Sequence, residues 1–167
     1  REDLMTLDNS LEIGQKLGVS PWILIDQEAI NRFGEVTRDP DPQHVDPEWS
    51  RQNSPWGTTI AFGFQTLSML SHMMASIMEH DNSRLDFHAF NYGLDYVRFL
   101  APVKSGSRIR GHFTLKDIDR RKPGQTKIVY HVEVEIEGED KPALVADWVG
   151  LAVDRGGLDR IKDDAST

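Results

Sequence analysis

The second half of the sequence alternates between apolar and polar residues over long stretches, and this restricts it to β-structure with one buried face. Ile109, Phe113 and Leu115 occupy alternate positions among polar side chains, and every second residue from Ile128 to Ile136 is apolar. Such period-two alternation is typical of antiparallel strands that pack against a core on one side. These two segments therefore predict neighbouring strands of a half-buried sheet.

Two further segments extend this predicted sheet. Residues 88–102 are rich in aromatic and β-branched side chains, which favour extended structure. Residues 143–153 are apolar on both faces, as expected of a strand that lies in the interior of a sheet. The sequence thus predicts three or four long antiparallel strands after residue 87.

A long apolar segment from about Ile60 to Glu79 precedes these strands and has the period of a helix. The apolar residues that recur every three or four positions are Ile60, Ala61, Phe64, Leu67, Leu70, Met74, Ile77 and Met78. Phe62, Met69 and Met73 widen the apolar face, so the predicted helix is buried on more than one side. We expect it to be the central helix of the fold.

Shorter elements are predicted at the beginning of the chain. Trp22–Ile25 has the composition of a short strand, and the helical spacing of apolar residues from Gln27 to about Val36 predicts a helix capped by Asp26. Residues 1–17 are polar with weak periodicity, and we expect a short helix draped over the fold.

Residues 37–47 are expected to form an irregular, stiff loop. Three of its residues are prolines, which exclude a continuing helix and restrict several backbone angles. Asp46 and Pro47 are a favourable cap and first residue for a short helix that ends near Arg51.

This order of elements is α+β. A curved antiparallel sheet wrapped around one long central helix buries the helix and the alternating strand faces together, and that arrangement is the hotdog fold. A chain of 167 residues has the size of one domain. We expect the domain to span 1–167 with its core at about 13–153, while 1–10 and 154–167 are peripheral or frayed.

Composition excludes several classes of function. Nineteen Lys and Arg against 27 Asp and Glu give a net charge of −8, which disfavours nucleic acid and anionic membranes as partners. The absence of cysteine excludes thiol nucleophiles and thiolate metal sites. No stretch approaches the ~20 apolar residues that span a bilayer, so a cytoplasmic location is expected. The histidines lack the close spacing of metal ligands, and we expect neither a metal nor a cofactor.

The proline-rich loop contains the first candidate for chemistry. Asp39 and His44 are five residues apart, and a stiff loop can direct both side chains toward one point. A carboxylate and an imidazole held in this way can activate water. Taken alone, the loop residues are more typical of an ordinary turn that carries a surface histidine.

The second candidate is the segment Gly57–Phe64, which leads into the predicted central helix. Gly63 lies near the start of this helix, where a backbone N–H is free to donate to a developing oxyanion. Alternatively, Gly63 only allows the helix to pack closely against the sheet.

Together these segments resemble the MaoC-like hydratases, the hotdog group that includes (R)-specific enoyl-CoA hydratases and nodulation-protein-N-like proteins. Members carry a loop of the form Asp-x-Asn/Gln-x-x-His-x-Asp and a Gly-Thr-Ile-Ala-His-Gly-type approach to the central helix. Here these motifs correspond to Asp39–Asp46 and Gly57–Phe64. Asn91–Val103 and Gly106–Arg110 also resemble strands of the group, so that the likeness runs from about Ile13 to Val153.

The resemblance implies a lyase that adds water across the C2–C3 double bond of an acyl thioester, or removes it. Trans-2-enoyl-CoA and (R)-3-hydroxyacyl-CoA are the implied substrate and product. Asp39 and His44 would bind and polarise the water, while the Gly63 N–H would hold the thioester oxygen. The resemblance also implies a homodimer or a dimer of dimers. The residues expected to contact the substrate are Asp41, Trp56, Gly57, Phe62, Phe64, Asn91 and Tyr92.

Three positions depart from the pattern of the family. Phe62 stands where many members have His, Asp41 where Asn or Gln is frequent, and Arg38 where Gly is common. These departures indicate an altered pocket or substrate. Two other functions stay open: a hotdog thioesterase, in which water attacks the thioester carbonyl, and a non-catalytic protein that binds acyl or aromatic ligands.

Overall fold

The computed structural model describes residues 11–78, 87–120, 123–154 and 156–158, and it has the predicted α+β order. Six strands form one antiparallel sheet in the order β1-β4-β5-β6-β3, and β2 also pairs with β4. The strands are β1 Lys16–Val19, β2 Ile23–Ile25, β3 Phe87–Phe99, β4 Ser107–Asp119, β5 Gln125–Ile136 and β6 Leu144–Asp154. The helices are α1 Gln27–Thr37, α2 Pro42–Val45, α3 Pro47–Asn53, α4 Gly63–Ser68 and α5 Leu70–Met78.

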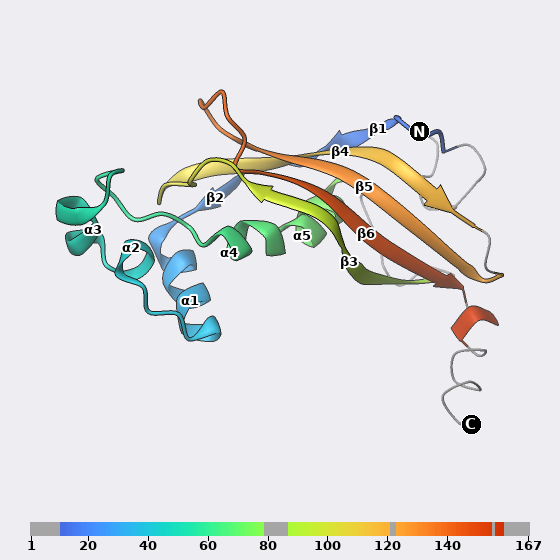
Figure 1. The fold of residues 1–167 in the computed structure, drawn as a ribbon, viewed down its shortest axis with the longest axis horizontal. Helices are drawn as coiled ribbons and strands as arrows, with labels where there is room; N and C mark the ends of the chain where they lie inside the picture. Colours follow the sequence, from blue (N-terminus) through green and yellow to red (C-terminus); the bar gives the residue numbers. More distant parts are fainter. Residues whose placement is uncertain (1–10, 79–86, 121–122, 155, 159–167) are drawn as a thin grey trace.

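The sheet curves over α4 and α5, while α1, α2 and α3 gather at one end of the molecule (Figure 1). The alternating residues of β4 and β5 that were predicted to face a core are buried except for the half-buried Tyr130, and Phe113, Leu115 and Val132 are at most 1% exposed. The strand that is apolar on both faces, β6, lies between β5 and β3, as predicted. The curved sheet and its enclosed helices are those of the hotdog fold.

The central helical segment begins later than predicted and is divided in two. Residues Ile60–Phe62 are extended, α4 starts at Gly63, and α5 follows after Met69. Ser68 Oγ donates to the Gln65 carbonyl at 2.7 Å, and the Met69 N–H turns to the Thr66 carbonyl at 3.3 Å. A serine hydroxyl that donates to a helix carbonyl competes for that carbonyl with the backbone N–H four residues further along the helix. The prediction of one long helix was wrong in this respect.

Aspartates begin the three N-terminal helices. Asp26 accepts a hydrogen bond from the Ala29 N–H at 2.8 Å, and Asp46 accepts one from the Trp49 N–H at 2.9 Å, which confirms both predicted caps. The proline-rich loop is more regular than predicted, because Asp41 caps the single turn of α2.

The predictions for the chain ends are tested only in part. Residues 1–10 and 159–167 lie outside the described residues, as does His80. The described residues before β2 form a turn and the strand β1 instead of the predicted helix. No helix within the described ranges is long and apolar enough to cross a membrane.

Candidate active site

Two segments that are far apart in the sequence, the proline-rich loop and the approach to α4, are joined by hydrogen bonds. The Ile60 N–H donates to the Gln43 carbonyl at 3.1 Å, and His44 Nδ1 lies 2.7 Å from the Ile60 carbonyl oxygen. Gln27 Nε2 donates to the His44 carbonyl at 2.8 Å, and the Gln27 amide oxygen accepts from the Thr59 hydroxyl. The segments that carry the two predicted motifs therefore form one site.

The bond to Ile60 determines the proton positions of His44. A carbonyl oxygen can only accept, so Nδ1 carries the proton and donates it. In the neutral imidazole the proton-free nitrogen is then Nε2, which is able to accept a proton from water. His44 is 9% exposed, so the predicted alternative of a surface histidine is wrong.

Phe62 packs directly against this imidazole. The centres of the His44 and Phe62 rings are 3.9 Å apart, with an angle of 31° between the ring planes. Phe62 also packs on Phe33, with 5.2 Å between the ring centroids. Only 6% of Phe62 is exposed. Phe62, which departs from the family pattern, is thus a buried side chain that packs against the ring of the candidate base.

Asp39 follows a backbone reversal at the end of α1. Arg38 has φ +59° and ψ +36°, and it is the only non-glycine residue with positive φ in the described part of the chain. The reversal lets the Asp39 N–H donate to the Gly34 carbonyl at 2.9 Å. A Cβ on Gly34 would lie 3.0 Å from the Asp39 carbonyl oxygen and 3.2 Å from Phe62 Cζ, so Gly34 permits this close approach.

The Asp39 side chain is exposed and lines an open cavity of about 510 Å³ at the end of α1. The other lining residues are Asn31, Gly34, Glu35, Arg38, Pro40 and Val45. Asp39 Oδ1 accepts from the Asp41 N–H at 3.2 Å. Gly34 thus lies close to the Asp39 backbone on one side and to the Phe62 ring on the other, while His44 and Phe62 are not among the residues that line the cavity.

Asp41 is used within the loop itself. Its carboxylate accepts from the Gln43 N–H and from Gln43 Nε2, each at 3.0 Å. Asp41 therefore caps the turn that carries His44, and its predicted contact with substrate stays a prediction.

Gly63 is the first residue of α4, and its N–H consequently has no acceptor within the helix. Its Cα packs on the ring of Phe99, because an added Cβ would lie 3.1 Å from that ring. The close helix–sheet contact is thus present at Gly63, and donation of its N–H to an oxyanion stays a prediction. The helix is only six residues long, so the contribution of its dipole is smaller than a long helix would provide.

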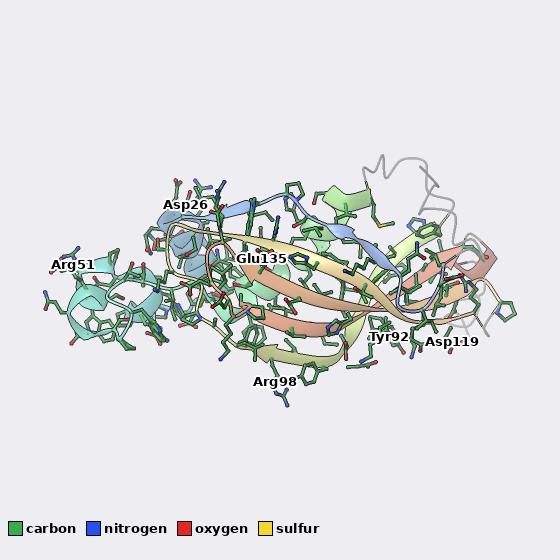
Figure 2. The ribbon with its side chains drawn as sticks, turned by 90° about the horizontal axis from the view of Figure 1, so that it is seen from above. Asp26, Arg51, Tyr92, Arg98, Asp119 and Glu135 are labelled. Carbon is green, nitrogen blue, oxygen red and sulfur yellow. The ribbon has the colours of Figure 1, made fainter. Side chains whose placement is uncertain are left out.

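Five of the predicted substrate contacts are exposed. Trp56 and Gly57 lie in the turn after α3, and Phe64 is 71% exposed beside Phe99. Asn91 and Tyr92 are exposed on β3, and the contact of these five residues with substrate stays a prediction. Tyr92 and Arg98 lie along the same edge of the sheet (Figure 2).

Two orienting groups were missed by the sequence analysis, the Ile60 carbonyl and the Gln27 side chain. A backbone carbonyl has no sequence signal, and the spacing of Gln27 within α1 is that of any helix side chain. Only the contact between the loop and the approach to α4 reveals them.

The face of the sheet opposite the helices carries paired charges. Glu135 accepts from Arg110 Nε and from the His112 ring, both at 2.6 Å (Figure 2 marks Glu135). Asp147 accepts from Lys116 Nζ at 2.5 Å and from His131 Nδ1 at 3.0 Å. These histidines bond to carboxylates, and the described residues contain no cluster of His, Cys, Asp and Glu able to hold a metal.

The sequence matches the model of the MaoC like domain over residues 8–138, and the chain belongs to this family. It is 46% identical to nodulation protein N of Rhizobium meliloti, over 87% of this chain and 89% of that protein. It is 40% identical to 3-hydroxyacyl-thioester dehydratase Z of Mycobacterium tuberculosis, over 85% of this chain and 91% of that protein. The fold matches the monoamine oxidase regulatory protein of Archaeoglobus fulgidus with a TM-score of 0.74, 24% identity, and coverage of 87% and 92%.

Proposed function

We propose that this protein is a hydratase or dehydratase that interconverts a trans-2-enoyl thioester and the (R)-3-hydroxyacyl thioester. The observation that carries the proposal is the 2.7 Å contact between His44 Nδ1 and the Ile60 carbonyl, because it leaves Nε2 as a proton acceptor in a buried site. The name of the relative from Mycobacterium tuberculosis supports the same reaction class.

In the hydration direction, His44 Nε2 takes a proton from water while the water oxygen bonds to C3. The Asp39 carboxylate accepts the second O–H of the same water and so orients it. Electrons of the double bond move toward the thioester carbonyl, whose oxygen is held by the Gly63 N–H. The proton that His44 took from water is then returned to C2, which completes the addition. The dehydration follows the same steps in reverse.

The proposed substrate carrier is coenzyme A, and the proposed assembly is a homodimer formed along β3. This strand has 13 residues and, among the described strands, pairs only with β6. It exposes large apolar side chains, with Tyr92 66%, Phe90 47% and Phe99 45% exposed. A long apolar edge strand is a template for pairing with another chain. Pairing of β3 with β3 of a second copy would cover this edge.

Product analysis with a panel of 2-enoyl-CoA substrates tests the proposal. We expect 3-hydroxyacyl-CoA to form without release of free thiol, and His44→Ala and Asp39→Asn each to lower the rate by on the order of 10²-fold. His72→Ala, which changes an exposed histidine of α5, is the matched control and keeps the wild-type rate. Release of free CoA would instead identify a thioesterase, and tight binding without turnover would identify a ligand-binding protein.

A further inference from the structure

Gln65 is a polar residue on the buried stripe of the central helical segment. It is the third residue of α4 and is 5% exposed. Other residues of this segment, Thr66, Leu70 and Met73, are also buried. Phe62, whose ring packs on His44, is the extended residue immediately before α4, three positions before Gln65 in the sequence.

The amide oxygen of Gln65 has no partner. It is the one buried side-chain nitrogen or oxygen atom that lacks a hydrogen bond within the described parts of the chain. Other buried polar groups nearby are satisfied: Thr66 Oγ1 donates to the Phe62 carbonyl, and Ser50 Oγ donates to the Pro42 carbonyl. A buried acceptor without a donor is costly, and an apolar residue at this position would remove the cost.

A molecule that enters the site beside Gly63 can supply the missing donor. On the proposed function, the thioester carbonyl lies at the Gly63 N–H, and the carrier arm leads from there to solvent. Gln65 is more buried than Gly63 and Phe64, and on the proposed function we therefore place it along the acyl chain and not along the carrier arm. An amide oxygen only accepts, and the group that it meets must carry an O–H or N–H.

We infer that Gln65 is a specificity-determining residue and that the acyl chain of the substrate carries a hydrogen-bond donor, a hydroxyl in the simplest form. The Gln65 amide oxygen accepts from this hydroxyl while C2 and C3 lie beside His44. A plain hydrocarbon chain leaves the amide oxygen unsatisfied and is the poorer substrate.

Pairs of 2-enoyl-CoA substrates that differ only by a hydroxyl at C4, C5 or C6 test the inference. We expect the wild-type protein to favour one hydroxylated member over its plain counterpart by about 10-fold or more in kcat/KM. Gln65→Leu removes this preference and raises the melting temperature of the unliganded protein. Thr66→Val changes the neighbouring buried hydroxyl, which is already bonded within the helix, and retains the preference.

The inference is overturned if the wild-type protein treats every pair alike, or if the preference survives in Gln65→Leu. Failure of the proposed reaction is a separate outcome, in which no enoyl-CoA is turned over. In that case a binding measurement tests whether Gln65 recognises a hydroxyl on the acyl chain. Paired saturated acyl-CoA ligands with and without the hydroxyl must shift the melting temperature of the wild-type protein differently, and that of Gln65→Leu equally.

Discussion

The imidazole of His44 packs on the phenyl ring of Phe62, with the ring centres 3.9 Å apart and the ring planes tilted by 31°. The contact joins a loop residue to the residue immediately before α4, and both side chains are more than nine-tenths buried. Together with the bond from Nδ1 to the Ile60 carbonyl, it fixes the plane of the imidazole. The direction of the Nε2 lone pair, on which the proposed proton transfer depends, follows from these two contacts.

Phe62→Leu should weaken both the fold and the proposed activity. The substitution keeps an apolar side chain but removes the ring contacts with His44 and Phe33. We expect the free energy of unfolding to fall by about 1–1.5 kcal/mol in urea denaturation. The hydration rate should fall by about 10-fold, because the imidazole loses one of its two restraints. Val36→Ala, on the exposed face of α1, is the control, and equal effects of the two substitutions would contradict this role of Phe62.

Arg38→Gly should stabilise the protein. A left-handed backbone costs a residue with a Cβ roughly 1–2 kcal/mol, and glycine is free of this cost. The greater freedom of glycine in the unfolded chain offsets part of the gain, so we expect the free energy of unfolding to rise by about 0.5–1 kcal/mol. Arg38→Ala removes the same side chain but keeps the Cβ, and it should show no such gain. Equal stability of the Gly and Ala variants would refute the backbone explanation.

Leu94→Lys should separate the proposed dimer. Leu94 lies on β3 and is 41% exposed, and a charge on an edge strand opposes pairing with another chain. Sedimentation equilibrium at micromolar concentration should show a dimer for the wild-type protein and a monomer for this variant. Val36→Lys places the same charge on the 84% exposed side chain of α1 and should leave the dimer intact. A wild-type monomer would disprove pairing along β3.

Asp147 should make the stability of the fold depend on acidic pH. Burial by itself would raise the pKa of Asp147, but the hydrogen bonds from Lys116 and His131 outweigh it and hold the pKa below its usual value. A carboxylate with a lowered pKa in the folded state stabilises the fold above its unfolded pKa of about 4. This contribution is lost as the pH falls through the lower, folded value.

Urea denaturation of Asp147→Asn between pH 7 and pH 2 measures this contribution. The variant should be less stable than the wild-type protein at pH 7, and the difference should shrink as the pH falls below about 4. Glu139→Gln, which changes an exposed carboxylate in the turn before β6, is the control at each pH. A difference that is constant over the whole range would exclude the ion pairs of Asp147 as its cause.

Much of the architecture follows from local patterns in the chain. The alternation of apolar residues predicts β4 and β5 because successive side chains of a strand point to opposite faces. Asp26 and Asp46 predict helix starts because their side chains bond to the backbone only three residues away. The motif residues His44 and Gly63 could be singled out for the same reason, since each motif is contiguous.

The contacts that give the candidate site its properties are not local. The proton position of His44 depends on a carbonyl 16 residues away. The unsatisfied amide of Gln65 is visible only once every neighbour has been placed. Periodicity is a property of the covalent chain, whereas partners in space depend on how the whole sheet closes over α4 and α5.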